Sequence, residues 1–237
     1  MKYWSKVNKL YEDMICAVTG SVVRDEPLKN HTYFKIGGPA SIFSEPKDTE
    51  DLKTVLKLIK KYDVDCFVMG NGTNLLVSDD GFKGAIVKIG NKFNFVEKNG
   101  NRVTAGAGIL LSVLAKYLAG EGLAGFEFAG GIPGSLGGAV CMNAGAYGGE
   151  MKQVIKKVRC MDYGGNIHEF SNEEMEFEYR HTKISDSEYI VIDAELELTY
   201  GDIDEIMSSI KTLNEKRISK QPVNMPSAGS TFKRPSK

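Results

Sequence analysis

Apolar residues recur every three or four positions in several stretches of the chain, which is the spacing of a helix with one buried face. These stretches predict four helices, over residues 1 to about 24, 48–61, 110–118 and about 202–219. Asp48 or Thr49 can cap the second helix, and Gly120 and Gly122 are placed to end the third.

Other stretches alternate apolar and polar residues, or are short and apolar throughout, as strands are. They predict strands over residues 66–69, 85–89 and 189–198, and a hairpin over residues 157–170 that turns at Gly164-Gly165. One face of the last strand carries Ile190, Ile192, Ala194, Leu196 and Leu198. Short helices mixed with alternating strands, without a regular alternation of the two, indicate an α+β fold.

Composition places the chain among ordinary globular proteins, with 237 residues of which 42% are hydrophobic and 26% charged. One large domain or two smaller ones fit this length. Lys and Arg total 30 and Asp and Glu total 31, so no overall basic field attracts nucleic acid. The sequence has neither a signal-peptide core nor an apolar stretch of membrane-spanning length. We therefore expect a cytoplasmic protein without a nucleic-acid or membrane partner.

The chain has four cysteines, Cys16, Cys66, Cys141 and Cys160, which lie far apart and form no C-x-x-C pair. Their apolar neighbours indicate reduced, mostly buried thiols. A metal site would need clustered ligands or several histidines, and the chain has three histidines. We therefore expect no metal site.

A first glycine-rich segment, MGNGTNLLV, includes and follows the end of the predicted strand 66–69. Its Asn-Gly pair is typical of a tight turn, but its consecutive backbone N–H groups could equally converge on a phosphate. The segment nearly matches the Rossmann fingerprint, yet Leu75 occupies the third glycine position and no helix pattern follows. A Rossmann unit is therefore disfavoured, and the turn and the phosphate site both stay open.

A second segment, GGIPGSLGGAVCMNAGAYGG, spans residues 130–149 and has eight glycines in twenty residues. Flexible linkers are polar, whereas this segment carries apolar anchors such as Ile132 and Leu136. Glycines among apolar anchors indicate backbone held close against something flat or bulky, and Ser135 and Asn143 can donate hydrogen bonds to a ligand. Two such loops about sixty residues apart imply one large ligand with a diphosphate, such as a dinucleotide.

The chain resembles the UDP-N-acetylenolpyruvoylglucosamine reductase (MurB) family in five segments: NHTYFKIGGPA, MGNGTNLLVSDDGFKGAIV, GFEFAGGIPGSLGGAVCMNAGAYGGE, EYRHTKI and PSAGSTFKRP. The resemblance covers about residues 30–235 and implies a two-subdomain α+β fold of the PCMH/MurB type with FAD between the subdomains. It divides the chain into an amino-terminal helical segment (1–29), an FAD-binding domain (30–200) and the start of an α+β substrate-binding domain (201–237).

This resemblance implies that both glycine segments bind FAD. The residues that would hold the diphosphate are Gly70, Asn71, Gly72, Thr73, Asn74 and Leu75. The residues that would line the flavin and the rest of the cofactor are Gly130, Pro133, Gly134, Ser135, Gly137, Gly138, Ala139, Asn143, Gly145 and Ile192.

The family reduces the enolpyruvyl ether of UDP-N-acetylglucosamine to UDP-N-acetylmuramate, a step toward peptidoglycan. NADPH reduces FAD, and the flavin passes hydride to C3 of the enolpyruvyl group. The resemblance implies that Arg180 stabilises the charge that develops at C2 and that Ser230 protonates C2. Lys220, Lys233 and Arg234 suit the UDP diphosphate. By residue type alone, Arg180 fits a surface strand, Ser230 a turn, and the Lys-Arg pair a solvated terminus.

The chain also departs from the family pattern. Family members continue for some tens of residues past the serine motif and carry a catalytic glutamate near the carboxyl end, whereas this sequence ends at Lys237, seven residues after Ser230. The spacing around EYRHTKI resembles the more compact subtype. We expect a monomeric flavin-dependent reductase. The alternatives are an FAD-binding protein that is impaired in catalysis and another oxidase on the same fold.

Overall fold

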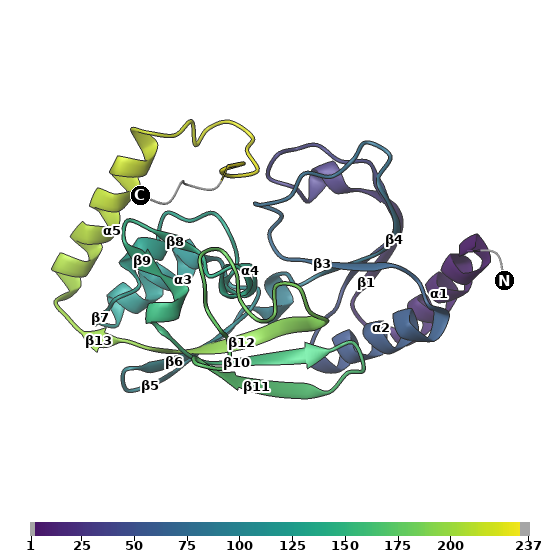
Figure 1. Cartoon of the computed structure of the whole chain (residues 1–237), viewed down its shortest axis with the longest axis horizontal. Coiled ribbons are helices and arrows are strands. Elements are labelled where there is room, and N and C mark those ends of the chain that lie inside the picture. The colour runs from purple at the N-terminus through teal and green to yellow at the C-terminus, as the bar shows by residue number, and fades with distance from the viewer. Residues whose placement is uncertain (1–2, 233–237) are drawn as a thin grey trace.

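The computed structural model describes residues 3–232. Two α+β bodies lie side by side, each with one main sheet and helices over a face of it (Figure 1). The first body runs from α1 (Tyr3–Ala17) to β4 (Phe82–Lys88), and the second runs from β5 (Val96–Asn99) to α5 (Ile203–Ile218). The connection between them contains the short 3-10 helix η2 (Asn91–Phe93).

The first body has a four-stranded sheet and two helices packed on one face of it. Its remaining elements are β1 (Ser21–Pro27), η1 (Leu28–Asn30), β2 (Pro39–Glu45), α2 (Thr49–Tyr62) and β3 (Cys66–Met69). The strand order is β1-β2-β4-β3, with β1 antiparallel to β2 and the other pairs parallel. The face away from α1 and α2 has a small core of its own, formed by Leu28, Ala40, Phe43, Met69 and Ile86.

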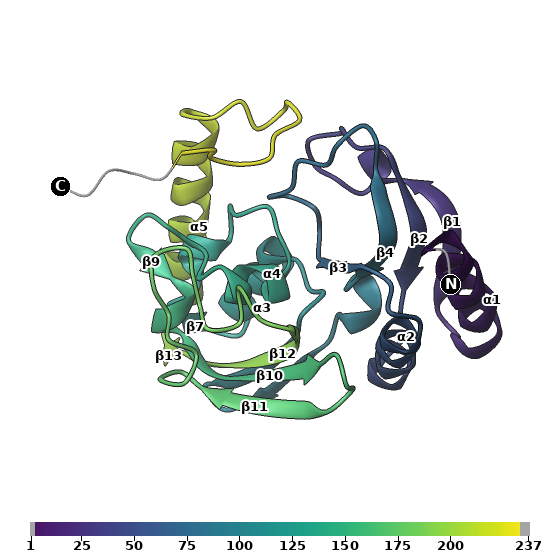
Figure 2. The ribbon, with the colours of Figure 1, turned by 45° about the vertical axis from the view of Figure 1, so that its right-hand side comes forward.

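The second body has a five-stranded antiparallel sheet, order β11-β10-β12-β6-β5. Helices lie over one face of this sheet (Figure 2). The elements of this body are β6 (Arg102–Gly106), α3 (Leu111–Gly120), β7 (Leu123–Ala124), η3 (Glu127–Ala129), α4 (Leu136–Cys141), β8 (Gly145–Ala146), β9 (Gly149–Glu150), η4 (Met151–Gln153), β10 (Ile155–Asp162), β11 (Ile167–Ser171), β12 (Tyr189–Glu197) and β13 (Thr199–Tyr200).

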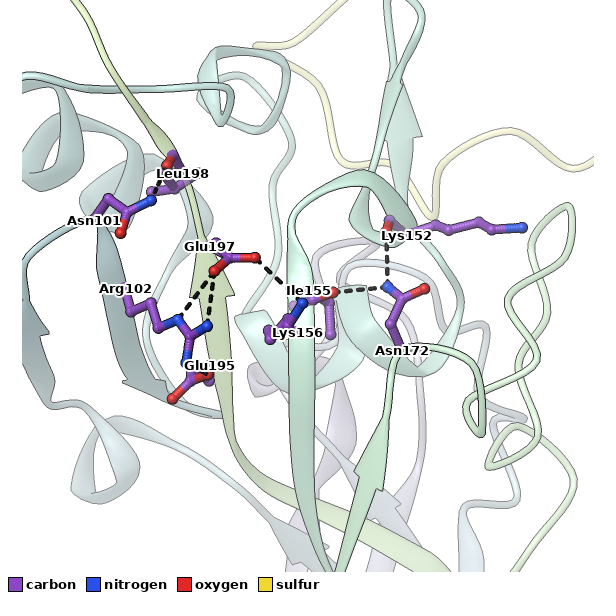
Figure 3. Close-up of polar contacts among 9 residues, drawn as sticks. All are labelled: Asn101, Arg102, Lys152, Ile155, Lys156, Asn172, Glu195, Glu197 and Leu198. Atoms are coloured by element: carbon purple, nitrogen blue, oxygen red, sulfur yellow. Dashed lines mark hydrogen bonds and ion pairs between the residues drawn. The ribbon is translucent and has the colours of Figure 1, made fainter.

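Ion pairs and amide hydrogen bonds join the strands of the second sheet along its polar positions (Figure 3). Arg102 on β6 pairs with Glu197 on β12 at 3.0 Å, and Lys156 on β10 pairs with the same carboxylate at 3.3 Å. Asn101 donates to the Leu198 carbonyl at 2.7 Å, beside the last residue of β12. These contacts lie at one end of β12 and link it to both neighbouring strands.

The sequence predicts a helix to about residue 24, and this prediction is wrong beyond Ala17. The Asp51 carboxylate accepts hydrogen bonds from the backbone of Thr19 (2.7 Å) and Gly20 (2.8 Å) and turns the chain there. The following residues, which include the β-branched pair Val22 and Val23, then pair with β2 as β1. The division of the chain at residues 29 and 200 stays a prediction.

Two other expectations need correction. Residues 136–141, inside the second glycine segment, form the short helix α4 although two of them are glycine. The four cysteines are free, but of them Cys160 alone is fully buried, while Cys16 is exposed and Cys66 and Cys141 are half-buried. Burial raises the pKa of the Cys66 and Cys160 thiols to about 12, so both stay protonated at neutral pH.

Two features are absent from residues 3–232. Within that range no helix is both long and apolar enough to cross a membrane. The same part of the chain holds no cluster of three or more His, Cys, Asp or Glu side chains that could bind a metal ion.

Candidate cofactor and active site

The two glycine segments, far apart in sequence, meet in the folded chain. The first follows β3, and the second leads into α4. A Cβ atom added to Gly70 would lie 2.5 Å from the hydroxyl of Ser135, and one added to Gly134 would lie 3.4 Å from that of Thr73. The structure therefore brings together two sets of residues that the sequence identifies separately, one from each body.

The first glycine segment is held in place by residues 31–33, and several of its backbone N–H groups have no acceptor among the described residues. The Gly72 carbonyl accepts a hydrogen bond from Tyr33 N–H at 2.9 Å, and the backbone of His31 packs directly on Gly72. Gly72 has φ +64, a conformation that favours glycine. Within residues 3–232, the backbone N–H groups of residues 71–75 donate to no protein acceptor. Consecutive N–H groups without partners fit a phosphate anion.

The glycines of the second segment divide into two groups by what surrounds them. Most are close-packed, since a Cβ would lie 3.0 Å from Ile210 at Gly130, 2.8 Å from Ala107 at Gly137 and 2.5 Å from the Gly149 carbonyl at Gly145. Gly134, Gly138 and Gly148 are different, because a Cβ at any of them would meet nothing closer than 3.4 Å. Gly148 is an exposed turn residue with φ +89, a conformation that favours glycine. Protein packing or turn geometry therefore explains the other glycines, while Gly134 and Gly138 leave space beside the first segment and α4.

The remaining residues expected from the sequence along this segment differ in exposure. Ser135 and Ala139 are buried, each 5% exposed, and the loop residue Pro133 is exposed. The side chain of Ile192 on β12 is also buried, and its carbonyl accepts from Ala107 N–H at 2.8 Å. Contact between any of these residues and a cofactor stays a prediction.

Arg180 lies in a tight turn, and not on the strand that its residue type alone suggested. The turn is closed by hydrogen bonds between the backbones of Glu178 and His181, and Arg180 itself has φ +59. Its guanidinium donates to the carbonyl of Asn143 at 3.1 Å and to that of Gly145 at 2.8 Å. The turn therefore places a permanent positive charge beside the second glycine segment.

Asn143 is occupied by contacts within the protein. Its side-chain amide donates to the Glu178 carbonyl at 2.9 Å and to the Glu150 carboxylate at 3.2 Å, and its side-chain oxygen accepts from Lys152 N–H at 3.0 Å. The residue is 1% exposed. Both of its amide hydrogens have protein acceptors, so the direct ligand contact expected from the sequence stays a prediction.

The loop after α5 approaches the first glycine segment, running above the second body toward the first in Figure 1. A Cβ on Gly229 would lie 3.5 Å from the side-chain oxygen of Asn74. Ser230 follows Gly229 and is exposed, and Lys220 is exposed just beyond α5. Lys233 and Arg234, expected to contact the UDP diphosphate, lie outside the described residues.

Sequence reasoning missed the residues that join the Arg180 turn to the end of α4. The hydroxyls of Thr182 and Ser185 both donate to the Cys141 carbonyl at 2.6 Å. No pattern of spacing signals these contacts, because the partners are about forty residues apart. The only available signal was the position of Thr182 inside the EYRHTKI segment.

Comparisons with known sequences indicate the same family as the sequence motifs, along most of the chain. Residues 40–171 match the FAD binding domain family. A UDP-N-acetylenolpyruvoylglucosamine reductase of Clostridioides difficile (strain 630) is 54% identical over 211 residues, which are 89% of this chain and 69% of that protein. The protein of that name from Clostridium perfringens (strain SM101 / Type A) is 44% identical over 235 residues, 99% of this chain and 75% of its own length.

Solved structures agree with the sequences. The UDP-N-acetylenolpyruvylglucosamine reductase (MurB) from Thermus caldophilus superposes with a TM-score of 0.77 at 32% identity, covering 91% of this chain and 75% of its own. 6-Hydroxy-D-nicotine oxidase from Arthrobacter nicotinovorans, at 17% identity and a TM-score of 0.60, covers 78% of this chain and 43% of its own and shares the fold alone. These matches confirm the α+β FAD-binding fold, and the chain belongs to the UDP-N-acetylenolpyruvoylglucosamine reductase family.

Proposed function

We propose that this protein reduces UDP-N-acetylglucosamine enolpyruvate to UDP-N-acetylmuramate with electrons from NADPH, in peptidoglycan precursor synthesis. The observation that carries the proposal is the position of Arg180, whose guanidinium is held by two carbonyls of the glycine segment that also leaves space at Gly134 and Gly138. The proposal also draws on the names of the relatives, which are reductases of this substrate.

The residues present fit FAD. Five consecutive backbone N–H groups, at residues 71–75, suit its diphosphate, and the space beside Gly134 and Gly138 suits a flat ring system. FAD, when bound, supplies the hydride chemistry, taking hydride from NADPH and giving it to C3 of the enolpyruvyl group. The protein supplies binding, orientation and charge.

Arg180 is proposed to stabilise the negative charge that develops on C2 and its carboxylate when C3 gains hydride. A guanidinium has five N–H donors in a fixed plane, and the two described carbonyls take one each. The other donors suit a carboxylate, which a guanidinium can meet with two parallel hydrogen bonds. Ser230 is proposed to give its hydroxyl proton to C2, and Lys220 to pair with the UDP diphosphate.

Substrate-dependent oxidation of NADPH tests the proposal. FAD-loaded protein is mixed with NADPH and the enolpyruvyl substrate, and formation of UDP-N-acetylmuramate is followed by mass spectrometry. We expect product with the parent and a large loss with Arg180→Ala. Oxidation of NADPH that is unaffected by the substrate, without product, would contradict the proposed function.

A second candidate is an FAD-binding protein with little turnover. The observation that favours it is the exposure of the serine loop, since Ser230 is exposed and the neighbouring Phe232 is 87% exposed. Proton transfer requires a donor held within hydrogen-bond reach of carbon. The same assay separates the two candidates.

We further propose that the protein is a cytoplasmic monomer.

A further inference from the structure

Two segments about forty residues apart are joined by hydrogen bonds behind the candidate active site. One is residues 141–145, at the end of α4, and the other is residues 178–185, which include the Arg180 turn. The hydroxyls of Thr182 and Ser185 donate to the Cys141 carbonyl, while Arg180 donates to the carbonyls of Asn143 and Gly145. The position of the guanidinium therefore depends on how residues 143–145 are held.

Asn143 is the residue that holds both sides of this junction. Its side-chain amide donates to the Glu178 carbonyl, two residues before Arg180, while its own carbonyl accepts from the Arg180 guanidinium. Its side-chain oxygen accepts from Lys152 N–H, which ties it to the segment that enters β10. A buried side chain with three hydrogen bonds and 1% exposure has one arrangement.

The anchor of Asn143 is itself fixed. The side chain of Asn172 donates to the carbonyls of Lys152 at 2.8 Å and Ile155 at 2.7 Å (Figure 3). Lys152, whose backbone N–H pairs with Asn143, is thereby held through its carbonyl in η4, just before β10. A continuous set of hydrogen bonds thus runs from the second sheet through Asn143 to Arg180.

We propose that Asn143 is a positioning residue for Arg180, an inference that rests on the proposed function for its catalytic meaning. Its side chain fixes the turn that carries Arg180, and its carbonyl fixes one nitrogen of the guanidinium. The remaining donors are thereby aimed at a carboxylate beside the glycine segment. Misplacement of a reacting group by about 1 Å can cost on the order of a hundredfold in rate.

Asn143→Gly tests the proposal while sparing the backbone. Asn143 has φ +41, which glycine adopts without strain, so the variant removes the side-chain contacts alone. Asn101→Gly is the matched control, since it removes another asparagine bond to a backbone carbonyl, at Leu198 (Figure 3). Should Asn143→Gly fail to fold, Asn143→Asp keeps the acceptor for Lys152 N–H and loses donation to the Glu178 carbonyl.

The first measurement does not depend on activity. NMR of arginine-labelled, FAD-loaded protein reports the guanidinium N–H signals of Arg180, assigned by their loss in Arg180→Lys. We expect resolved, slowly exchanging signals in the parent and in Asn101→Gly, and averaged signals in Asn143→Gly at an unfolding temperature that shows a folded protein. Unchanged Arg180 signals in folded Asn143→Gly would overturn the proposal.

The second measurement is a double-mutant cycle on the substrate-dependent re-oxidation of the flavin. Asn143→Gly should slow this step by ~10–100-fold in the parent and by less than about threefold in Arg180→Lys, since residues in one network are not additive. Equal losses in both backgrounds would show that Asn143 acts independently of Arg180. Absence of substrate-dependent re-oxidation in the parent would contradict the proposed function, and the NMR result would still decide whether Asn143 positions Arg180.

Discussion

Asp51 shows at the scale of one residue how a buried carboxylate organises the first body. It is 5% exposed and accepts hydrogen bonds from three backbone N–H groups, those of Thr19, Gly20 and Lys47. Burial acts to raise the pKa of Asp51, but these donors outweigh it and hold the pKa below its usual value of 3.8. The folded state therefore favours the ionised form of Asp51.

We expect Asp51→Asn to lower the free energy of unfolding by about 1–3 kcal/mol at pH 7, the range for leaving a buried donor unpaired. A group with a depressed folded pKa stabilises the fold above its unfolded pKa, about 3.9, and loses that contribution as pH falls through the folded value. The difference between parent and variant should therefore shrink below about pH 4. Urea unfolding at pH 7 and pH 3 measures it, with exposed Asp80→Asn as control. An equal difference at both pH values would contradict this assignment.

Gly134 offers a second residue-scale prediction. A Cβ there would meet nothing closer than the Thr73 hydroxyl at 3.4 Å, an ordinary contact, so Gly134→Val should fold but fill the space assigned to FAD. Overfilling a packed site costs about 1–3 kcal/mol, and about 1.4 kcal/mol is tenfold in affinity. We expect FAD affinity to fall by roughly ten- to a hundredfold, measured by flavin fluorescence. Parent-like affinity would place the cofactor elsewhere.

The proposed role of Ser230 can be tested separately from those of the other site residues, because it concerns one half-reaction only. If the serine only protonates the substrate, Ser230→Ala should leave flavin reduction by NADPH at the parent rate. Loss of a positioned proton donor should slow re-oxidation by the substrate by ~10²–10⁴. Stopped-flow absorbance measures each phase. A similar fall in both phases would remove Ser230 from this role.

At the scale of elements, the patterns that could be predicted were those set by local chemistry. The helix expected over residues 48–61 is α2, and its predicted cap Asp48 accepts from Asp51 N–H. The hairpin at Gly164-Gly165 and the strand that became β12 are also confirmed. The burial of the second face of β12 was not predicted. Asp193 lies on that face and is buried because it pairs with Arg159 on the neighbouring strand.

Elements set by distant contacts could not be predicted. Helix α4 has six residues, and a helix this short is not stable by itself. It forms because Leu136 and Gly137 donate to carbonyls of residues 107–109, and because Gly137 fits tightly against Ala107. The candidate site residues could be predicted because local motifs identify them. The contact between the two glycine segments could not, because it depends on how the whole chain folds.

Helix α4 also gives a prediction with two opposite signs. Gly138 is exposed on this helix and has open space beside it, so Gly138→Ala should raise the unfolding free energy of the FAD-free protein by about 0.5–1 kcal/mol. The same methyl group should weaken FAD binding. Denaturant unfolding and fluorescence titration measure the two effects. Gly137→Ala is the control, since its methyl group meets Ala107 at 2.8 Å and should destabilise. A stabilised variant with unchanged FAD affinity would contradict the role given to this face.

At the scale of the whole molecule, the candidate cofactor site lies where the two bodies meet. The first glycine segment belongs to one body and the second to the other, so a ligand bound by both stabilises each body and their arrangement together. Such a ligand binds the folded protein and not the unfolded chain, which raises the unfolding temperature by mass action.

We therefore expect the purified protein to be yellow and to release FAD when denatured, because the contacts proposed for the cofactor are non-covalent. FAD added to the stripped protein at about a hundred times its dissociation constant should stabilise the fold by about 2.7 kcal/mol. For a chain of this size that corresponds to a rise of roughly 5–10 °C in the unfolding temperature. Calorimetry measures the rise, which should fall to roughly half or less in Gly134→Val at the same FAD concentration, since a ten- to hundredfold weaker affinity leaves about 0.4–1.4 kcal/mol of stabilisation. A colourless protein whose unfolding temperature does not respond to FAD would contradict a cofactor held between the two glycine segments.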